Sequence, residues 1–279
     1  MIAHELAAST WEARLDLCFE RRGARTVLAR NAHYGPLRLQ KALYPEGEGV
    51  CHGIVLHPPA GVAGGDRLEL AARLDSGAHA LLTTPGAGKW YRSKGPRAAQ
   101  TLAFDVAPGA VLEWLPQETI VFDAALADLS CRVNLGGDAV FFGMDILCLG
   151  RTGSGERFTR GQIGMETRIE RDGRPIWLER GRLEGGGGLL QSPLGLAGNP
   201  VAGSFIAAAT GLTRAHLEAC RGVTAQQGEG AVTLLPDLLI ARYLGGSGAA
   251  ARAYFTAIWD MLRLPLCGRR ASPPRIWST

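Results

Sequence analysis

The chain has 279 residues, of which 46% are hydrophobic and 20% are charged. This balance suits a folded core and excludes a disordered chain, while the length excludes a miniprotein that depends on disulfides or metal ions. The 38 glycines are about twice the usual share of roughly 7%, which favours many turns over many helices. The net charge is +4 and no run of five basic residues occurs, so nucleic-acid binding is disfavoured.

Short strands separated by turn signals account for most of the first 190 residues. Apolar and polar residues alternate in several of these segments, and Pro or Gly closes most of them. The turn spacing of roughly 10–15 residues predicts a large β architecture rather than βαβ units. Asp172-Gly173 is typical of a tight hairpin turn. The expected strands cover residues 14–19, 37–44, 50–57, 68–75, 78–84, 102–106, 129–135, 140–149, 163–170 and 175–183.

The last third of the chain mixes helices with strands. Ser247 suits the N-cap and Pro265 the end of the longer expected helix. Apolar Ile276-Trp277 in the polar tail is expected to dock against the body. The expected elements are helices over 212–221 and 247–264 and strands over 232–235 and 238–244. One stripe of the longer helix should be buried, comprising Ala250, Tyr254, Phe255, Ile258, Met261 and Leu262.

The cysteines and the N-terminal segment indicate a cellular setting. The cysteines show no C-x-x-C pair and no spacing of a zinc or disulfide framework, so we expect buried free thiols in a reducing compartment. The first residues lack the basic and apolar regions of a secretory signal, and no stretch approaches about 18 apolar residues. We therefore expect a cytoplasmic protein that contacts neither membrane nor nucleic acid.

Two glycine-rich segments imitate nucleotide-binding loops without meeting their requirements. Residues 86–89, Gly-Ala-Gly-Lys, would need Gly at 83 and Ser or Thr at 90 to form a phosphate loop, but the chain has Thr83 and Trp90. Residues 150–155 show the spacing G-x-x-G-x-G, and no amphipathic helix clearly follows them. Neither segment supports nucleotide binding.

Four longer motifs follow one another along the chain. They are LHPPAGVAGGDRL at 56–68, LTTPGAGKWYRS at 82–93, LEWLPQETIVFD at 112–123 and LGRTGSGERF at 149–158. In this order and at these lengths they resemble the UreD family of urease accessory proteins, also called UreH. Shorter matches extend the resemblance over roughly residues 35–279. Gly143-Met144-Asp145 departs from the more usual Gly-Trp-Asp but keeps the acid.

The resemblance implies a fold and a role. The fold would be mainly β, a large many-stranded β-helix-like or stacked-sheet scaffold with a small helical element near the C-terminus. We expect one domain over 1–279, with a β-rich body over 1–200 and a mixed α/β part over 201–279. The role would be that of a nickel-insertion chaperone and not an enzyme. It would bind the urease apoprotein and, through UreF, the GTPase UreG, and would carry Ni²⁺ transiently without a tightly bound cofactor.

Single acids within or near the matched motifs are the candidate lining of a nickel passage. Carboxylates hold a borderline metal ion less tightly than imidazole and thiolate clusters do, which suits a metal that must move on. Glu179 is favoured because Arg180 and Arg182 lie on the opposite face of its expected strand. The candidates are Asp66, Glu69, Glu118, Asp123, Asp145 and Glu179.

Each candidate acid also has a purely structural interpretation. Asp66 follows two glycines and suits a turn residue that accepts hydrogen bonds from nearby backbone. Glu69 alternates with leucines and suits the solvent side of a strand, while Glu118 and Asp123 suit loop caps. Asp145 lies inside an apolar run and needs a partner if buried, for which an arginine is the ordinary solution.

Two further possibilities concern partners and catalysis. Lys89, Trp90, Tyr91 and Arg92 place two aromatic residues between two cations, which is typical of a protein interface, although a packed aromatic corner is the alternative. The competing function is a β-solenoid glycoside hydrolase with Asp123 and Asp145 as its acid pair. That reaction needs two carboxyl groups about 5–10 Å apart in an open groove.

Overall fold

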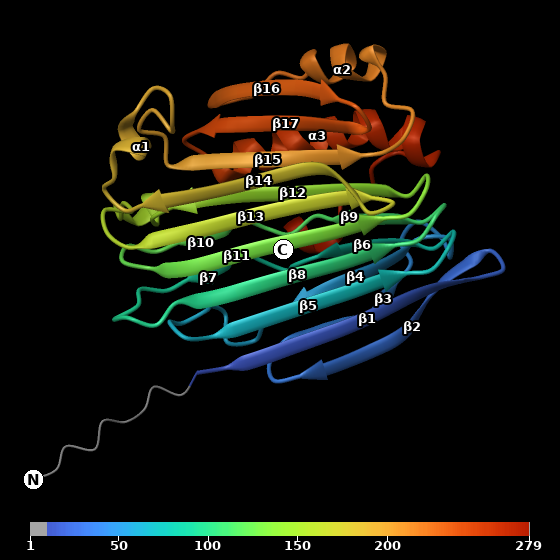
Figure 1. Ribbon diagram of the computed structural model, residues 1–279, viewed down its shortest axis with the longest axis horizontal. Coiled ribbons are helices and arrows are strands. Elements are labelled where there is room, and N and C mark those ends of the chain that lie inside the picture. Colours follow the sequence, from blue (N-terminus) through green and yellow to red (C-terminus); the bar gives the residue numbers. More distant parts are fainter. Residues whose placement is uncertain (1–9, 279) are drawn as a thin grey trace, which may run out of the picture.

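Residues 10–278, described by a computed structural model, form two β-sheets that lie face to face (Figure 1). The strands are β1 (Glu12–Arg22), β2 (Arg25–Tyr34), β3 (Arg38–Leu43), β4 (Cys51–Leu56), β5 (Arg67–Leu74), β6 (His79–Thr83), β7 (Gly88–Trp90), β8 (Ala98–Val106), β9 (Val111–Trp114), β10 (Thr119–Val121), β11 (Leu126–Leu135), β12 (Val140–Leu149), β13 (Gln162–Arg171), β14 (Arg174–Glu184), β15 (Val201–Ala208), β16 (Gly228–Leu235) and β17 (Leu238–Gly245). The helices are α1 (Gly188–Gln191), α2 (Arg214–Arg221) and α3 (Gly248–Cys267), with short 3-10 turns at Thr152–Ser154 and Arg275–Ser278.

The chain winds between the two sheets as in a β-solenoid. Sheet A has the order β14-β13-β11-β8-β5-β1-β2, and sheet B has the order β16-β17-β15-β12-β9-β6-β4-β3. Off this path, β10 pairs with β12, and β7 pairs with β10. From β4 to β13 the chain crosses repeatedly from one sheet to the other, so successive strands within each sheet run parallel. Antiparallel pairs lie at the ends of both sheets: β1-β2 and β13-β14 in sheet A, and β3-β4 and β16-β17 in sheet B. The expected mainly β, stacked, solenoid-like scaffold with a C-terminal helix is confirmed.

Sheet B has an apolar core on each of its faces. Between the sheets, alternate residues of β5 point inward and are buried, as the sequence pattern predicts. On the other face, α3 lies against β12, β15 and β17 (Figure 1). Here the rings of Phe142, Phe205 and Phe255 stack in succession. A Cβ atom on Gly203 would come within 2.7 Å of the Phe255 ring, so the glycine allows the helix to pack closely.

The long helix differs from its sequence prediction at its C-terminal end. Ser247 caps its N-terminus by accepting a hydrogen bond from the Ala250 backbone N–H, as expected. The expected end at Pro265 is wrong, because the helix continues to Cys267 and Gly268 closes it with φ +68°. A proline in the last turn removes one hydrogen bond, which the packed face of the helix outweighs. Met261, expected in the buried stripe, is 41% exposed.

Several smaller predictions are confirmed. The turn at Asp172-Gly173 has positive φ at both residues, as a type I′ hairpin requires. The tail docks through Trp277, whose ring packs on Trp259 and whose Nε1 donates to Thr83 Oγ1 at 2.8 Å. All six cysteines, which lie within the described residues, are free thiols, but only Cys18, Cys51 and Cys220 are buried, so the expected burial holds for half of them.

Within residues 10–278, none of the helices has the length and apolar character that crossing a membrane requires.

Candidate functional site

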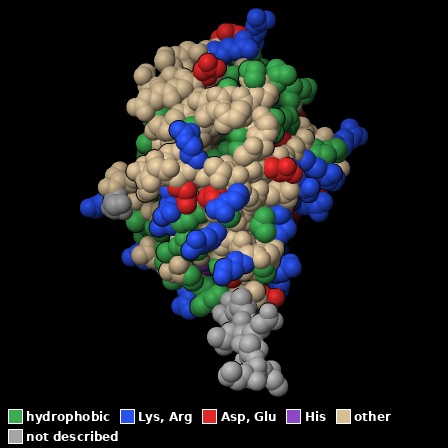
Figure 2. All heavy atoms as spheres, turned by 90° about the vertical axis from the view of Figure 1, so that its left-hand side faces the viewer, with side chains coloured by type: hydrophobic (Ala, Val, Ile, Leu, Met, Phe, Trp, Pro, Cys, Tyr) green, Lys and Arg blue, Asp and Glu red, His purple; other side chains and the backbone are tan. Residues whose placement is uncertain are grey.

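The four family motifs lie side by side at one end of the sandwich. A parallel bridge joins Val62 of the first motif to Trp90 of the second. β10, from the third motif, pairs with β7 of the second motif and with β12, which leads into the fourth. β7, β10 and α1 mark this end on the left of Figure 1, and Figure 2 shows basic, acidic and apolar side chains interspersed over it. We call it the motif end.

A cavity of about 580 Å³ lies between the two sheets. Its walls include Thr84 and Gln117 in loops of the motif end and reach inward to Met165 on β13 and Leu244 on β17. Three of the six candidate acids line it: Glu118, Asp145 and Glu179. The fold therefore brings together acids that come from widely separated parts of the chain.

Strand register arranges polar side chains as two facing rows inside this cavity. In sheet B, Asp145 of β12 pairs with Ser204 of β15, which pairs with Arg242 of β17. In sheet A, positions 131, 167 and 179 of β11, β13 and β14 are paired in the same way. We call the six residues the polar belt: Cys131, Thr167 and Glu179 from sheet A, and Asp145, Ser204 and Arg242 from sheet B.

Asp145 is the acid with the most unusual environment. Asp145 lies between the two sheets, but its side chain is exposed because it forms part of the cavity wall. The ordinary solution of a paired arginine is not used, since no ion pair or hydrogen bond to its carboxylate occurs among the described residues. Burial, and then the nearby charge of Glu179, raise the pKa of Asp145 to about 6, against a smaller opposing effect of Arg242.

The other two candidate acids in the cavity are each paired with an arginine from the C-terminal part of the chain. Glu179 accepts a hydrogen bond from Arg242 Nη2 at 2.7 Å across the cavity. Glu118 accepts one from Arg252 Nε of α3 at 3.0 Å. The argument that Glu179 faces away from Arg180 is confirmed, because Arg180 pairs with Glu166 on the outer surface of sheet A. The cavity is thus acidic but partly neutralised.

The remaining three candidate acids lie outside the cavity and have local partners. Asp66 is 4% exposed and accepts hydrogen bonds from the backbone N–H groups of Trp11 and Ala63, as a turn residue does. Glu69 pairs with Arg14 on the solvent face of sheet A at 2.8 Å. Although burial opposes the shift, hydrogen bonds from the Arg160 side chain and from backbone N–H groups lower the pKa of Asp123 to about 2.

The residues proposed for partner binding divide between core and surface. Trp90 is 2% exposed and belongs to the core between the sheets. Tyr91 is half-buried and meets the edge of the Phe122 ring at a centroid distance of 5.1 Å, so a packed aromatic corner is present. Lys89 is half-buried and Arg92 is exposed. Only part of this motif is therefore accessible to another protein.

The glycoside hydrolase alternative finds no acid pair in the geometry. Both oxygens of Asp123 are engaged by Thr159 and Arg160 in a loop at the motif end. Asp145 lines the cavity between the sheets, and Asp123 is not among the residues that line it. These two carboxylates therefore do not flank an open groove, as glycoside hydrolysis requires.

Comparison with known proteins identifies the family. A family model described as UreD urease accessory protein matches residues 12–278. The chain belongs to the UreD family. The urease accessory protein UreD of Azoarcus sp. is 60% identical over 269 residues, covering 96% of this chain and 94% of the relative. The proteins of the same name from Dechloromonas aromatica and Pseudomonas aeruginosa are 53% and 48% identical, over 97% and 96% of this chain and 95% of each relative.

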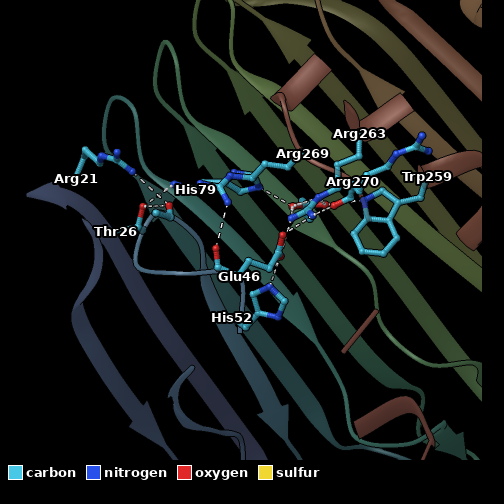
Figure 3. A network of polar contacts seen from close by, with 11 residues as sticks. Arg21, Thr26, Glu46, His52, His79, Trp259, Arg263, Arg269 and Arg270 are labelled. Atoms are coloured by element: carbon cyan, nitrogen blue, oxygen red, sulfur yellow. Dashed lines mark hydrogen bonds and ion pairs between the residues drawn. The ribbon is translucent and has the colours of Figure 1, made fainter. Parts of the chain in front are cut away.

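This UreD-family chain also holds a buried ionic cluster that sequence reasoning missed (Figure 3). Arg263 of α3, with a fully buried side chain, donates to Glu113 of β9 and to Glu46 in the loop between β3 and β4. His79 Nε2 lies 2.6 Å from Glu113 and His52 Nε2 lies 2.6 Å from Glu46. Two features of the sequence could have indicated this cluster. Glu113 lies inside the apolar run Val111–Trp114, and Arg263 follows Trp259 by four residues on the apolar stripe of the helix. The cluster joins the C-terminal helix to sheet B.

One group of three potential metal ligands occurs among residues 10–278 outside the cavity. Cys18, Glu20 and Asp75 have ligand atoms within 4.8 Å of one another. Arg73 already interacts with this group, since its guanidinium donates a hydrogen bond to the Cys18 sulfur and forms an ion pair with Asp75. This group of potential ligands therefore already has a cationic partner.

Proposed function

We propose that this protein is a nickel-insertion chaperone for urease, as the family resemblance implies. It would bind the urease apoprotein, link it through UreF to the GTPase UreG, and pass Ni²⁺ towards the urease active site. The observation that carries the proposal is the convergence of Glu118, Asp145 and Glu179 on one cavity between the sheets. Membership of a family whose members are named urease accessory proteins supports the same role.

The chemistry of the cavity suits a metal ion in transit. Its walls offer carboxylate and hydroxyl oxygens and the single thiol of the polar belt, rather than a cluster of histidines and cysteines. Burial raises the pKa of Cys131 to about 12, so its sulfur is a protonated and weak ligand. Arginines neutralise two of the acids. We therefore propose that nickel is bound weakly and transiently, and that the chain has neither a tightly bound cofactor nor a catalytic activity of its own.

The motif end is the proposed surface for the protein partners in the cytoplasm. Lys89, Tyr91 and Arg92 lie there beside loops that line the cavity. A partner seated on this end would cover the cavity, so that metal would pass without release into solution. Trp90 would support the surface from the core rather than contact the partner.

Co-purification tests the partner part of the proposal. The full chain, expressed with a urease apoprotein and UreF, is expected to retain both proteins through purification. Replacing Lys89 and Arg92 with Glu reverses two charges at the motif end and should release at least one partner. Arg14→Glu, on the solvent face of sheet A, is the control and should release neither. Capture of neither partner by the unaltered chain would overturn the proposal.

A further inference from the structure

The polar belt already contains a cation, the guanidinium of Arg242. It donates to Glu179 Oε1 at 2.7 Å and to Ser204 Oγ at 2.6 Å, so it connects sheet B to sheet A across the cavity. Asp145 lies in the same row of sheet B, two strands away from Arg242, with Ser204 between them. The two acids and the guanidinium therefore face a shared space.

Arg242 is held loosely in comparison with Arg263. The side chains of Arg242 and Glu179 are 41% and 39% exposed to the cavity and its surroundings, whereas Arg263 is fully buried between two glutamates. Partly exposed ion pairs contribute little to stability, so the Arg242–Glu179 contact can open at little cost. The Arg263 cluster cannot open in this way, because each glutamate would then be left buried and unpaired.

The guanidinium of Arg242 also lies over an aromatic ring, which could hold it when the contact with Glu179 opens. The Arg242 guanidinium carbon is 5.9 Å from the centre of the Trp177 ring, on the same strand as Glu179. Aromatic faces attract guanidinium groups within about 6 Å. The Trp177 Nε1 atom is buried without a hydrogen-bond partner, so no competing contact fixes the indole through this group. Movement onto this ring would leave Glu179 and Asp145 free to face a metal ion together.

We propose that Arg242 is a resident counter-ion of the polar belt, and that a divalent cation enters only by displacing its guanidinium from Glu179. This inference rests on the proposed function and adds a control of affinity to it. With the guanidinium in place the belt has too little negative charge to retain a divalent ion. Once it is displaced, the two carboxylates match the charge of Ni²⁺, and the returning guanidinium would favour release. Arg242 is thus a positioning residue that keeps binding weak.

Nickel titration of the purified full chain tests this role. Arg242→Gln keeps a hydrogen-bonding group near Ser204 but removes the charge, and should bind Ni²⁺ at least about tenfold more tightly in calorimetry. The expectation follows because one charge within about 4–6 Å changes the binding of a proton by tenfold or more. Release to a chelator, followed by stopped flow, should slow by a similar factor. Arg242→Lys restores a cation and should return both values towards those of the unaltered chain.

Control variants separate this inference from the proposed function. Arg14→Gln removes the matched exposed pair with Glu69 outside the cavity and should not change nickel binding. Unchanged or weaker binding in Arg242→Gln, with loss of binding in a variant carrying Asp145→Asn and Glu179→Gln, would refute the counter-ion role and leave the passage intact. If that double variant binds nickel as well as the unaltered chain does, the proposed passage itself is wrong.

Discussion

The buried cluster around Arg263 gives the most quantitative prediction about this fold. Arg263→Met keeps most of the side-chain volume but removes every hydrogen bond from the guanidinium to Glu113 and Glu46. Glu113 is fully buried and would keep only His79 and the Trp259 indole as partners. Removing one member of a buried ion pair costs about 3–5 kcal/mol, a large part of the roughly 5–15 kcal/mol that stabilises a typical protein.

Equilibrium unfolding in urea measures this loss directly. Arg14→Met, which removes an exposed pair, is the control and should lower the free energy of unfolding by no more than about 1 kcal/mol. Adding Glu113→Gln to Arg263→Met should recover part of the loss, because Glu113 then carries no unpaired charge. A loss of less than about 1 kcal/mol in Arg263→Met would refute the reasoning, since the cluster would then contribute no more than an exposed pair does.

The same cluster predicts a pH dependence. Although burial opposes the shift, hydrogen bonds from His52 and Arg263 lower the pKa of Glu46 from 4.5 to about 2. Its contribution is therefore present above about pH 4.5 and is lost as the pH falls towards 2. The difference between the unaltered chain and Arg263→Met should shrink over this range.

Two further predictions concern the cavity and the tail. Asp145 keeps its proton up to about pH 6 when folded, but ionises near its ordinary pKa of 3.8 when unfolded. Asp145→Asn should therefore raise the free energy of unfolding above pH 6, by up to about 1 kcal/mol after solvent screening, and change it little near pH 3. Urea unfolding at a series of pH values measures this difference. Trp277→Ala removes the indole packed on Trp259 and its hydrogen bond to Thr83. It should lower the free energy of unfolding by about 1–3 kcal/mol. A change within about 0.5 kcal/mol would show that the tail is not docked.

Local patterns in the sequence predict many of the strands and the direction of some side chains. The alternation in β5 fixes which residues are buried. The same rule places Glu179 opposite Arg180 and into the cavity. The pattern does not predict the short strands β7, β9 and β10, nor the longer β2 and β15, whose sequences lack this alternation. Most of β2 is exposed, and β15 is rich in small residues that pack closely beneath α3.

The set of acids that meet in one place cannot be derived from local patterns. Asp145, Ser204 and Arg242 become neighbours only through the pairing of β12, β15 and β17, which are far apart in sequence. For the same reason, Arg252 as the partner of Glu118 is invisible before the fold is known. Asp66 instead uses its carboxylate for nearby backbone, a role that the two preceding glycines already indicated.

The nickel content of urease matured with an altered cavity tests the central claim most directly. The variant carrying Asp145→Ala and Glu179→Ala would be expressed with the urease apoprotein, UreF and UreG, and the nickel bound per urease would be measured after purification. The account predicts that the variant still co-purifies with its partners while the nickel content and activity of urease fall severalfold. Full nickel content with intact partner binding would contradict it, because metal would then reach urease without the acids of the cavity.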